Sequence, residues 1–177
     1  MKYLLQLSSE LVVNAVLKST LERDGEQVLN YDQYLLHLIS TFSNRAKALS
    51  SSQYLSEFGL GSVEMRVIAS LAYRPEQKAS QVCELISIDK GAASRAFNRL
   101  AQEGLIQSDT PQGKQKLWSL TPSGWVLHRR FLKLVLAREQ HLIAGICEAD
   151  LVNFHRTLMA LTSNLTELEQ TLAIEKK

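Results

Sequence analysis

The sequence predicts a mainly α-helical protein that contains one small β-hairpin. Hydrophobic residues make up 45% of the 177 residues, and only three prolines interrupt the chain, which suits a compact, largely helical protein with a full core. Between Ser80 and Leu120, two short helical patterns are followed by two short strand patterns around a turn. We therefore expect a helix-turn-helix with an attached hairpin, flanked by longer helices.

The segment before the helix-turn-helix is expected to form three helices. Ser8 to Leu21 predicts an amphipathic helix, which Glu22-Arg23-Asp24-Gly25 would interrupt. A longer helix is expected to start near Asp32 and to end at Ser50-Ser51-Ser52. After a loop at Phe58-Gly59-Leu60-Gly61, a third helix should end at Tyr73, because Pro75 cannot continue it. The apolar faces carry Leu4, Leu7, Leu11, Val12 and Ala15, then Tyr34, Leu35, Leu38, Ile39, Phe42, Ala46 and Leu49, and finally Met65, Val67, Ile68 and Leu71.

Capping residues predict the bounds of the two short helices. Ser80 is expected to cap a helix from Gln81 to Ser87, and Asp89 to cap a helix from Lys90 to Gln102. Only Ile88 would separate the two helices, which is typical of a tight helix-turn-helix junction. Gly104 is expected to end the second helix in a left-handed conformation.

The hairpin and the helix after it are also marked by local signals. Leu105 to Ser108 and Lys116 to Leu120 predict two strands around a turn that contains Pro111 and Gly113. Thr121-Pro122 predicts a helix start, because a threonine hydroxyl can cap the helix and proline suits its first position. This helix is expected to break near Gly145.

The last helix carries an apolar seam in which spacings of three and four residues alternate. This pattern is typical of a coiled coil. We expect the seam to join two copies of the chain, since symmetric dimers dominate soluble oligomers; packing inside one subunit is the alternative. The predicted organisation is residues 1–56 as N-terminal helices of a dimerisation layer, 57–122 as a winged helix-turn-helix module, and 123–177 as C-terminal dimerisation helices. The seam consists of Leu151, Phe154, Leu158, Leu161, Leu165, Leu168 and Leu172.

One face of the expected helix from Lys90 to Gln102 is suited to nucleic acid. Small and hydrogen-bonding side chains can enter a major groove and contact phosphates and base edges. This face carries no glutamate before Glu103, whereas an ordinary surface helix would carry several. The other face should be buried. The exposed set is Gly91, Ser94, Arg95, Asn98 and Gln102, and the buried set is Ala93, Ala96, Phe97 and Leu100.

Composition and motifs argue against several other classes of protein. The net charge of +2 is weakly informative, and no apolar run approaches the length of a membrane span or forms a secretory leader. Cys83 and Cys147 are too few for a disulfide framework or a zinc knuckle, so a reducing cytoplasm is the expected location. Without a phosphate loop, a nucleophile elbow or a zinc-protease motif, we expect neither an enzyme nor a cofactor. The histidines lack ligand spacing: His37, His128, His141 and His155.

Four stretches resemble the MarR family of multiple-antibiotic-resistance-type winged-helix regulators. Phe58-Gly59-Leu60 with Met65-Arg66-Val67-Ile68 is similar to the entry into the family's second helix. Asp89 to Ala96 resembles the start of the recognition helix, Arg99 to Ile106 the passage into the wing, and Leu120 to Gly124 the end of the wing. Four such pieces in the right order and spacing are specific. The resemblance covers roughly Asp32 to Leu168.

The wing tip departs from the family pattern. The family usually has Asp-x-Arg there, and its arginine enters the minor groove; the matching positions here are Gln112, Gly113 and Lys114. Lysine keeps the charge but loses the planar fork of arginine. We therefore expect weaker anchoring of the wing, or a wing whose Lys114 and Lys116 contact only phosphates.

The resemblance implies a transcription regulator that binds a near-palindromic DNA operator as a homodimer. Arg95 is the expected specific base contact. Lys90, Ser94 and Asn98 would place the helix on the DNA, and Gly91 would allow a close backbone approach. Arg99 is expected either to reach a phosphate or to brace the wing through a carboxylate such as Asp109. Lys114 and Lys116 would supply charge on the wing, with a solvated surface cation as the alternative for each.

Most members of this family are repressors that release DNA on sensing a small molecule or another signal. The family pocket would lie near Phe42, Met65 or Trp125, although each of these is more simply a core residue. Cys83 is expected to be a buried inert thiol, and Cys147 lies at the break before the last helix. We do not expect either thiol to act as an oxidant sensor.

Two other interpretations remain open. The first is a winged-helix module that binds protein and has little affinity for DNA, which the altered wing tip and the near-neutral charge favour. The second is a small-molecule enzyme, which would need a deep polar pocket with paired titratable groups that nothing in the sequence predicts.

Overall fold

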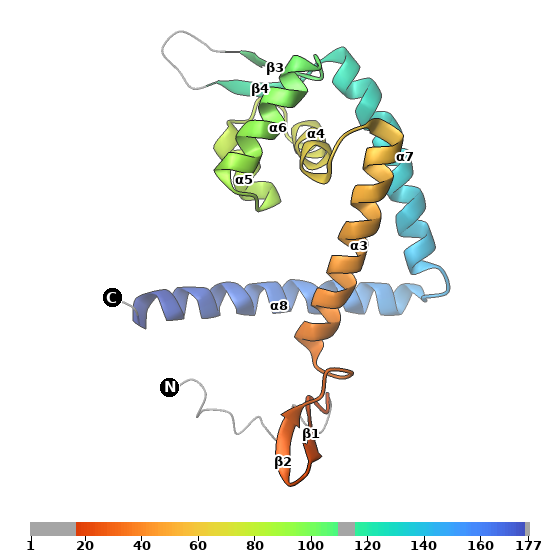
Figure 1. Cartoon of the computed structure of the whole chain (residues 1–177), viewed down its shortest axis with the longest axis vertical. Helices are drawn as coiled ribbons and strands as arrows, with labels where there is room; N and C mark the ends of the chain where they lie inside the picture. Colours follow the sequence, from red (N-terminus) through yellow and green to blue (C-terminus); the bar gives the residue numbers. More distant parts are fainter. Residues whose placement is uncertain (1–16, 110–115, 176–177) are drawn as a thin grey trace. The chain divides into compact units, whose positions relative to one another are not determined.

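The computed structural model describes residues 17–109 and 116–175. Its elements confirm the predicted fold class, which is mainly helical with a small hairpin beside a helix-turn-helix (Figure 1). The chain divides into two units, Met1–Gly124 and Trp125–Lys177. The elements are β1 (Thr20–Arg23), β2 (Glu26–Leu29), α3 (Leu35–Phe58), α4 (Ser62–Tyr73), α5 (Ala79–Ile86), α6 (Lys90–Gln102), β3 (Ile106–Asp109), β4 (Leu117–Leu120), α7 (Pro122–Ile143) and α8 (Glu148–Glu175).

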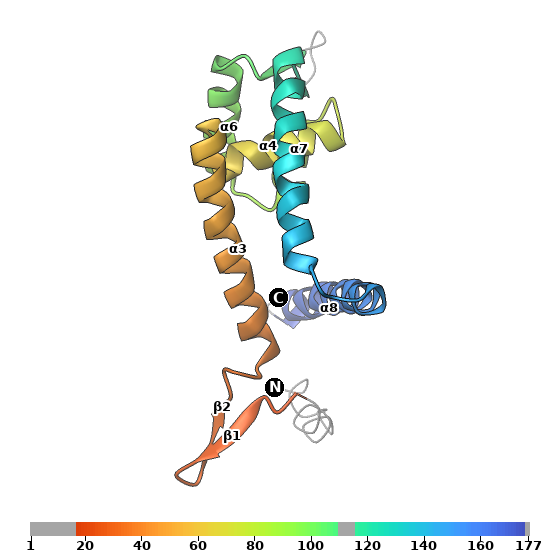
Figure 2. The ribbon, with the colours of Figure 1, turned by 90° about the vertical axis from the view of Figure 1, so that its right-hand side faces the viewer.

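The core of the first unit is built around α4. This helix packs against α3, α5, α6 and β4, and Figure 2 shows it running crosswise to α3. Four of its apolar side chains are fully buried, as expected: Met65, Val67, Ile68 and Leu71. Burial of a side chain of this size stabilises a fold by about 1.5–3 kcal/mol. The core under the helix-turn-helix is therefore well formed.

Two predicted capping sites and one predicted stop are confirmed. The Ala92 N–H donates to Asp89 Oδ1 at 2.8 Å and so starts α6. Gly104, directly after α6, has a φ of 68°. The Gly124 N–H donates to Thr121 Oγ1 at 3.0 Å, and this hydroxyl donates to the carbonyl of Gly104 at 2.7 Å. Thr121 therefore starts α7 and also fastens it to the end of α6.

The N-terminal region corrects one prediction. Thr20 and Leu21 were assigned to a helix, but they lie in β1, which pairs antiparallel with β2 in the register Thr20↔Leu29 and Leu21↔Val28. Asp24 and Gly25 form the turn with φ values of 55° and 83°. An Asp-Gly pair adopts positive φ readily and matches the twist of a two-residue hairpin, so this pair favours a hairpin over a helix break. Residues 17–19 of the expected helix are not helical either, and residues 8–16 lie outside the described residues.

Helix α3 is longer than predicted. It begins at Leu35, and it continues through Ser50-Ser51-Ser52 to Phe58. Ser50 Oγ donates to the Ala46 carbonyl at 2.6 Å. Serine can satisfy its hydroxyl on the helix's own backbone in this way and need not end the helix. The stop comes instead at Gly59, which has a φ of 66°. The expected domain boundary at residue 56 thus lies inside α3.

The start of α5 also differs from the prediction. The helix begins at Ala79, so Ser80 lies in its first turn and is not the cap. The Gln81 side chain reaches back and its Oε1 accepts from the Lys78 N–H at 2.9 Å, which is half of a capping box. The helix ends at Ile86, and Ser87 has a φ of 49°. The junction with α6 is therefore Ser87 to Asp89 and not Ile88 alone.

In the second unit, α7 ends at Ile143, and Gly145 has a φ of 83°, so the break predicted there is confirmed. Helix α8 is 28 residues long, and none of its residues is buried. Its predicted apolar seam lies on a continuous helix but stays largely exposed in the single chain, with Phe154 64% and Leu165 55% exposed. An apolar stripe of this length is unusual on the surface of a monomer.

Candidate nucleic-acid interface

The two faces of α6 differ as the sequence predicts. Its apolar stripe is buried: Ala93, Ala96, Phe97 and Leu100 are 3% exposed or less. The opposite side is open to solvent over Gly91, Ser94, Arg95, Asn98 and Gln102, and Lys90 at the start of the helix is exposed as well. The buried stripe fixes the rotation of α6, so the polar face has one defined orientation.

Arg95 lies over the first turn of α6. A Cβ atom placed on Gly91 would be 3.5 Å from Arg95 Nη1 and 3.1 Å from Asp89 Oδ1. The absent side chain of Gly91 therefore leaves room for both charged groups. The pKa of Asp89 lies below its usual value, mainly because its carboxylate accepts from the Ala92 N–H, and the nearby Arg95 charge contributes.

Arg99 contacts the body of the module and not the wing. Its Nη2 donates to the Gly59 carbonyl at 2.7 Å, its Nε donates to Glu103 Oε1 at 3.0 Å, and its Nη1 lies 3.5 Å from Glu64 Oε1. The expectation of Asp109 as its partner is wrong, because the guanidinium is already engaged by Gly59, Glu103 and Glu64. The hydrogen bond with Glu103 raises the pKa of Arg99.

The wing is held on two sides. Strands β3 and β4 pair from Ile106↔Leu120 to Asp109↔Leu117, within one residue of their predicted bounds. The backbone of Trp118 exchanges hydrogen bonds with Gln77, at 2.8 and 3.2 Å. The Trp118 ring also lies 5.0 Å from the Phe97 ring, centroid to centroid. The wing is thus fixed both to the segment before α5 and to the recognition-type helix α6.

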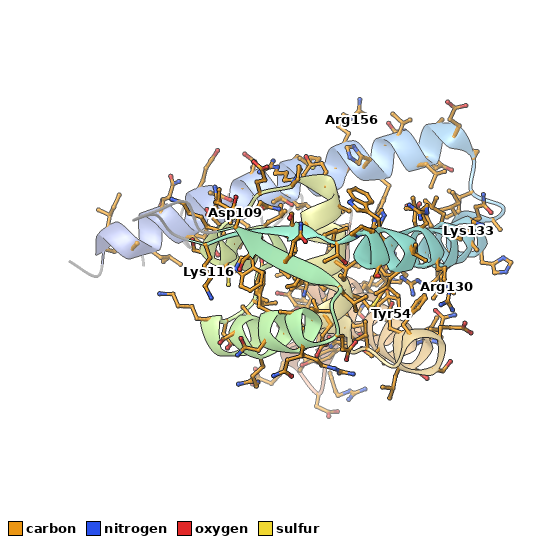
Figure 3. All side chains as sticks on the ribbon, turned by 90° about the horizontal axis from the view of Figure 1, so that it is seen from above. Tyr54, Asp109, Lys116, Arg130, Lys133 and Arg156 are labelled. Carbon is orange, nitrogen blue, oxygen red and sulfur yellow. The ribbon has the colours of Figure 1, made fainter. Side chains whose placement is uncertain are left out.

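Of the two lysines predicted to lie on the wing, only Lys116 is among the described residues. Its side chain is exposed, and its ammonium lies 5.9 Å from the centroid of the Trp118 ring. Figure 3 shows Lys116 and Asp109 at the same end of the hairpin. The predicted wing-tip residues Gln112, Gly113 and Lys114 lie outside the described residues.

Gln77 is a structural residue that the sequence analysis missed. Its side chain is 5% exposed, and its Nε2 donates to the main-chain carbonyls of Ser70 and Arg74 at 2.9 and 2.5 Å. Gln77 therefore closes the end of α4 with its side chain while its backbone pairs with the wing. No local motif marks it; the one available signal is its place directly after the helix break at Pro75.

The three residues expected near a ligand pocket differ in how far they are buried. Met65 is fully buried, as a core residue should be. Phe42 and Trp125 are 61% and 39% exposed, so their assignment to the core is wrong for the single chain. Both lie on long helices, α3 and α7, that also expose other large apolar side chains, such as Leu49 and Leu132.

The remaining candidates give no site among the described residues. Cys83 is half-buried, whereas Cys147 is exposed and its Sγ lies 3.2 Å from Asp150 Oδ2. Within residues 17–109 and 116–175, no group of three His, Cys, Asp or Glu side chains is placed to hold a metal ion. In the same part of the chain, no helix is both long and apolar enough to cross a membrane.

Comparison with known proteins identifies the fold. A model of the MarR family matches residues 58–115. A MarR/EmrR family transcriptional regulator from Acinetobacter sp. ADP1 is 23% identical with a TM-score of 0.72, covering 78% of this chain and 99% of that one. FabT of Streptococcus pneumoniae, solved in complex with DNA, is 21% identical with a TM-score of 0.65, covering 78% and 99%.

The MepR–DNA complex of S. aureus is 19% identical with a TM-score of 0.65, covering 74% of this chain and 96% of that one. No curated protein sequence matches the chain significantly. The match of residues 58–115 and the shared architecture confirm the predicted resemblance: this part of the chain is similar to the MarR family model, and the chain has the same fold as the solved MarR-type regulators.

Proposed function

We propose that the chain is a sequence-specific DNA-binding transcriptional regulator and not an enzyme. The observation that carries this proposal is the polar face of α6. It is exposed, free of glutamate up to Glu103, and held in one orientation by the buried stripe of Ala93, Ala96, Phe97 and Leu100. A helix with such a face fits the major groove of B-DNA. Two structures with the same fold, those of FabT and MepR, are complexes with DNA.

In this proposal α6 enters the major groove by its N-terminal half. Arg95 reads a guanine through two acceptors, which is the commonest specific contact of arginine. Lys90, Ser94 and Asn98 position the helix on phosphates and base edges, and Gly91 allows the backbone to come close. Lys116, together with Lys114, contacts phosphates from the wing. All of these except Lys114 are exposed described residues.

For Arg99 we infer that it braces the body of the module, which is neither the expected bracing of the wing nor a phosphate contact. Its guanidinium already donates to the Gly59 carbonyl and to Glu103, so a phosphate would have to compete with these acceptors. Its direct contact with DNA stays a prediction. In either role, Arg99 would help to set the position of α6.

We propose further that the protein binds DNA as a homodimer. The apolar seam of α8 is exposed, and so are apolar residues of α3 such as Leu38, Phe42 and Leu49, and apolar surfaces of this size are typical of protein interfaces. Residues 1–56 and 123–177 would form the dimerisation layer, and residues 57–122 the DNA-binding module. Two modules related by a two-fold axis match a near-palindromic operator with half-sites about one helical turn apart.

By analogy with the family, the regulator would act in the cytoplasm as a repressor that a small molecule or another signal releases. Such release requires the signal to favour one spacing of the two modules over another. No cofactor is required for binding DNA through side chains and backbone alone.

The decisive experiment starts from a pool of random DNA duplexes, from which the protein selects its tightest sequence. Fluorescence anisotropy then compares this duplex with a scrambled one across a salt series. We expect selective binding with a steep salt dependence, as for a protein that neutralises several phosphates. Equal and weak binding to both duplexes would contradict the proposal.

Arg95→Ala separates this function from a winged-helix module that binds protein. If Arg95 reads a base, the substitution should cost about 1–3 kcal/mol on the selected duplex and relax the preference at one base pair. Arg23→Ala is the matched control, because it removes the same charge from the exposed strand β1. Unchanged DNA affinity in Arg95→Ala would favour the protein-binding interpretation.

A further inference from the structure

The side chains of Asp89 and Arg95 share the space that Gly91 leaves empty. Asp89 Oδ1 and Arg95 Nη1 lie 3.1 and 3.5 Å from the point where a Cβ of residue 91 would be. Arg95 therefore does not extend outward from the middle of α6; its guanidinium lies back over the first turn. In a recognition helix the N-terminal residues are those that meet base edges.

A side chain in an α-helix leans towards the N-terminus, so helix geometry already directs the Arg95 side chain over Gly91, one turn earlier. The N-terminus of a helix carries a partial positive charge, so a guanidinium resting there is disfavoured on its own. The Asp89 carboxylate supplies the opposite charge close by, without forming a direct ion pair with Arg95. It is fixed in place, because its Oδ1 accepts from the Ala92 N–H at 2.8 Å. The low pKa of Asp89, to which the Arg95 charge contributes, agrees with this arrangement.

We propose that Asp89 is a positioning residue that holds the Arg95 guanidinium over Gly91, ready to read a guanine. This inference rests on the proposed DNA-binding function and adds to it the residue that orients the base-reading side chain. A free arginine side chain loses many rotamers on binding, and a side chain already held near its bound position loses fewer. Asp89 would thus increase discrimination between bases even though its own charge repels DNA.

Because Asp89 also repels DNA, its substitution can distinguish the effect of its charge on overall affinity from its effect on base discrimination. Asp89→Asn removes the negative charge and keeps a side chain that caps helices equally well. If Asp89 affects binding only by repelling the DNA phosphates, the substitution should tighten binding to every duplex and leave base discrimination unchanged. If Asp89 positions Arg95, discrimination should fall at the one base pair that Arg95 reads.

The experiment uses the full chain and the duplex selected by the wild-type protein. A set of duplexes with each base pair replaced in turn first locates the pair at which Arg95→Ala loses discrimination, expected to be about five- to 150-fold. Asp89→Asn should then lose about two- to tenfold at the same pair and nothing at the others. In the double variant Asp89→Asn/Arg95→Ala, the Asp89 substitution should have no further effect on discrimination.

Asp89→Ser is the second variant, because its hydroxyl also caps α6, and it should behave as Asp89→Asn does. Unchanged circular dichroism and melting temperature show that both variants fold. An even change on all duplexes, or a loss at base pairs other than the one read by Arg95, would overturn the inference. The proposed function fails separately, when the wild-type protein selects no sequence at all.

Discussion

Arg99 Nη2 donates to the main-chain carbonyl of Gly59 at 2.7 Å, although the two residues are forty positions apart in the sequence. Gly59 is the residue that ends α3, and Arg99 lies in the last turn of α6. The bond therefore links the end of the long N-terminal helix to the helix that we propose to enter DNA. Glu64, at the start of α4, lies 3.5 Å from the same guanidinium and makes the link a three-helix contact.

Substitution of Arg99 tests this link. Arg99→Ala should lower the melting temperature moderately, because the Gly59 carbonyl and Glu64 then have only water as a partner. Arg99→Lys should recover little of this loss, since the lysine ammonium lacks the planar guanidinium through which arginine reaches three acceptors at once. Thermal unfolding followed by circular dichroism provides the measurement, and the exposed Arg45→Ala is the control. A melting temperature equal to that of the wild type would contradict the bracing role.

Gln77 should matter more than its unremarkable sequence position suggests. Gln77→Ala removes the donor to the Ser70 and Arg74 carbonyls in a site that is 5% exposed. A buried acceptor left without a donor costs about 1–3 kcal/mol, and here the loss falls mainly on the Arg74 carbonyl, because the Ser70 carbonyl keeps the Arg74 N–H as a donor. Urea unfolding measures this loss, and Gln140→Ala, at an exposed position of α7, should cost clearly less. An equal effect of the two substitutions would be inconsistent with the buried role of Gln77.

The seam of α8 predicts a change in oligomeric state. Leu165→Glu places a charge in the middle of the apolar stripe, and burial of an unpaired charge in an interface is strongly unfavourable. Sedimentation equilibrium should therefore show a dimer for the wild-type protein and a shift towards monomer for the variant. Ser163→Glu adds the same charge outside the seam and should leave the dimer intact. A wild-type protein that sediments as a monomer would refute the dimer.

His128 predicts the sign of a pH dependence. Burial, together with the nearby Arg129 charge, lowers the pKa of His128 from its ordinary value of 6.5. The unfolded chain therefore binds a proton at a higher pH than the folded chain, so the free energy of unfolding should fall as the pH drops through about 6.5. The difference should be complete below the folded pKa and absent well above 6.5. Urea unfolding between pH 5 and 8, as a comparison range around the ordinary histidine pKa, should show a flatter profile for His128→Gln.

Features with a local physical cause could be predicted from the sequence. Asp89, Gly104 and Thr121 act on backbone groups within three or so residues, and each was placed correctly. The buried stripe of α6 follows from helical spacing alone. The Asp24-Gly25 turn also has a local cause, because this pair adopts positive φ readily, yet the apolar spacing before it predicts a helix where the structure has a strand.

Features that depend on distant partners could not be predicted in this way. Glu103, four residues after Arg99, is a local partner, but Gly59 and Glu64 lie 40 and 35 residues earlier, and nothing next to Arg99 distinguishes them from Asp109. The side-chain acceptors of Gln77 are close in sequence, but its pairing with Trp118 spans the whole helix-turn-helix. Likewise, the spacing of Phe42 and Trp125 predicts an apolar face without telling whether the same chain covers it.

The exposed seam of α8 also has a consequence for how the protein would respond to its own abundance. Under the proposed pairing, only two chains together present two modules to an operator. Below the dissociation constant of the pair, the number of pairs varies with the square of the chain concentration, so halving the chains leaves about one quarter of the pairs. Regulation by this protein would then switch more sharply with its expression level than regulation by a monomer.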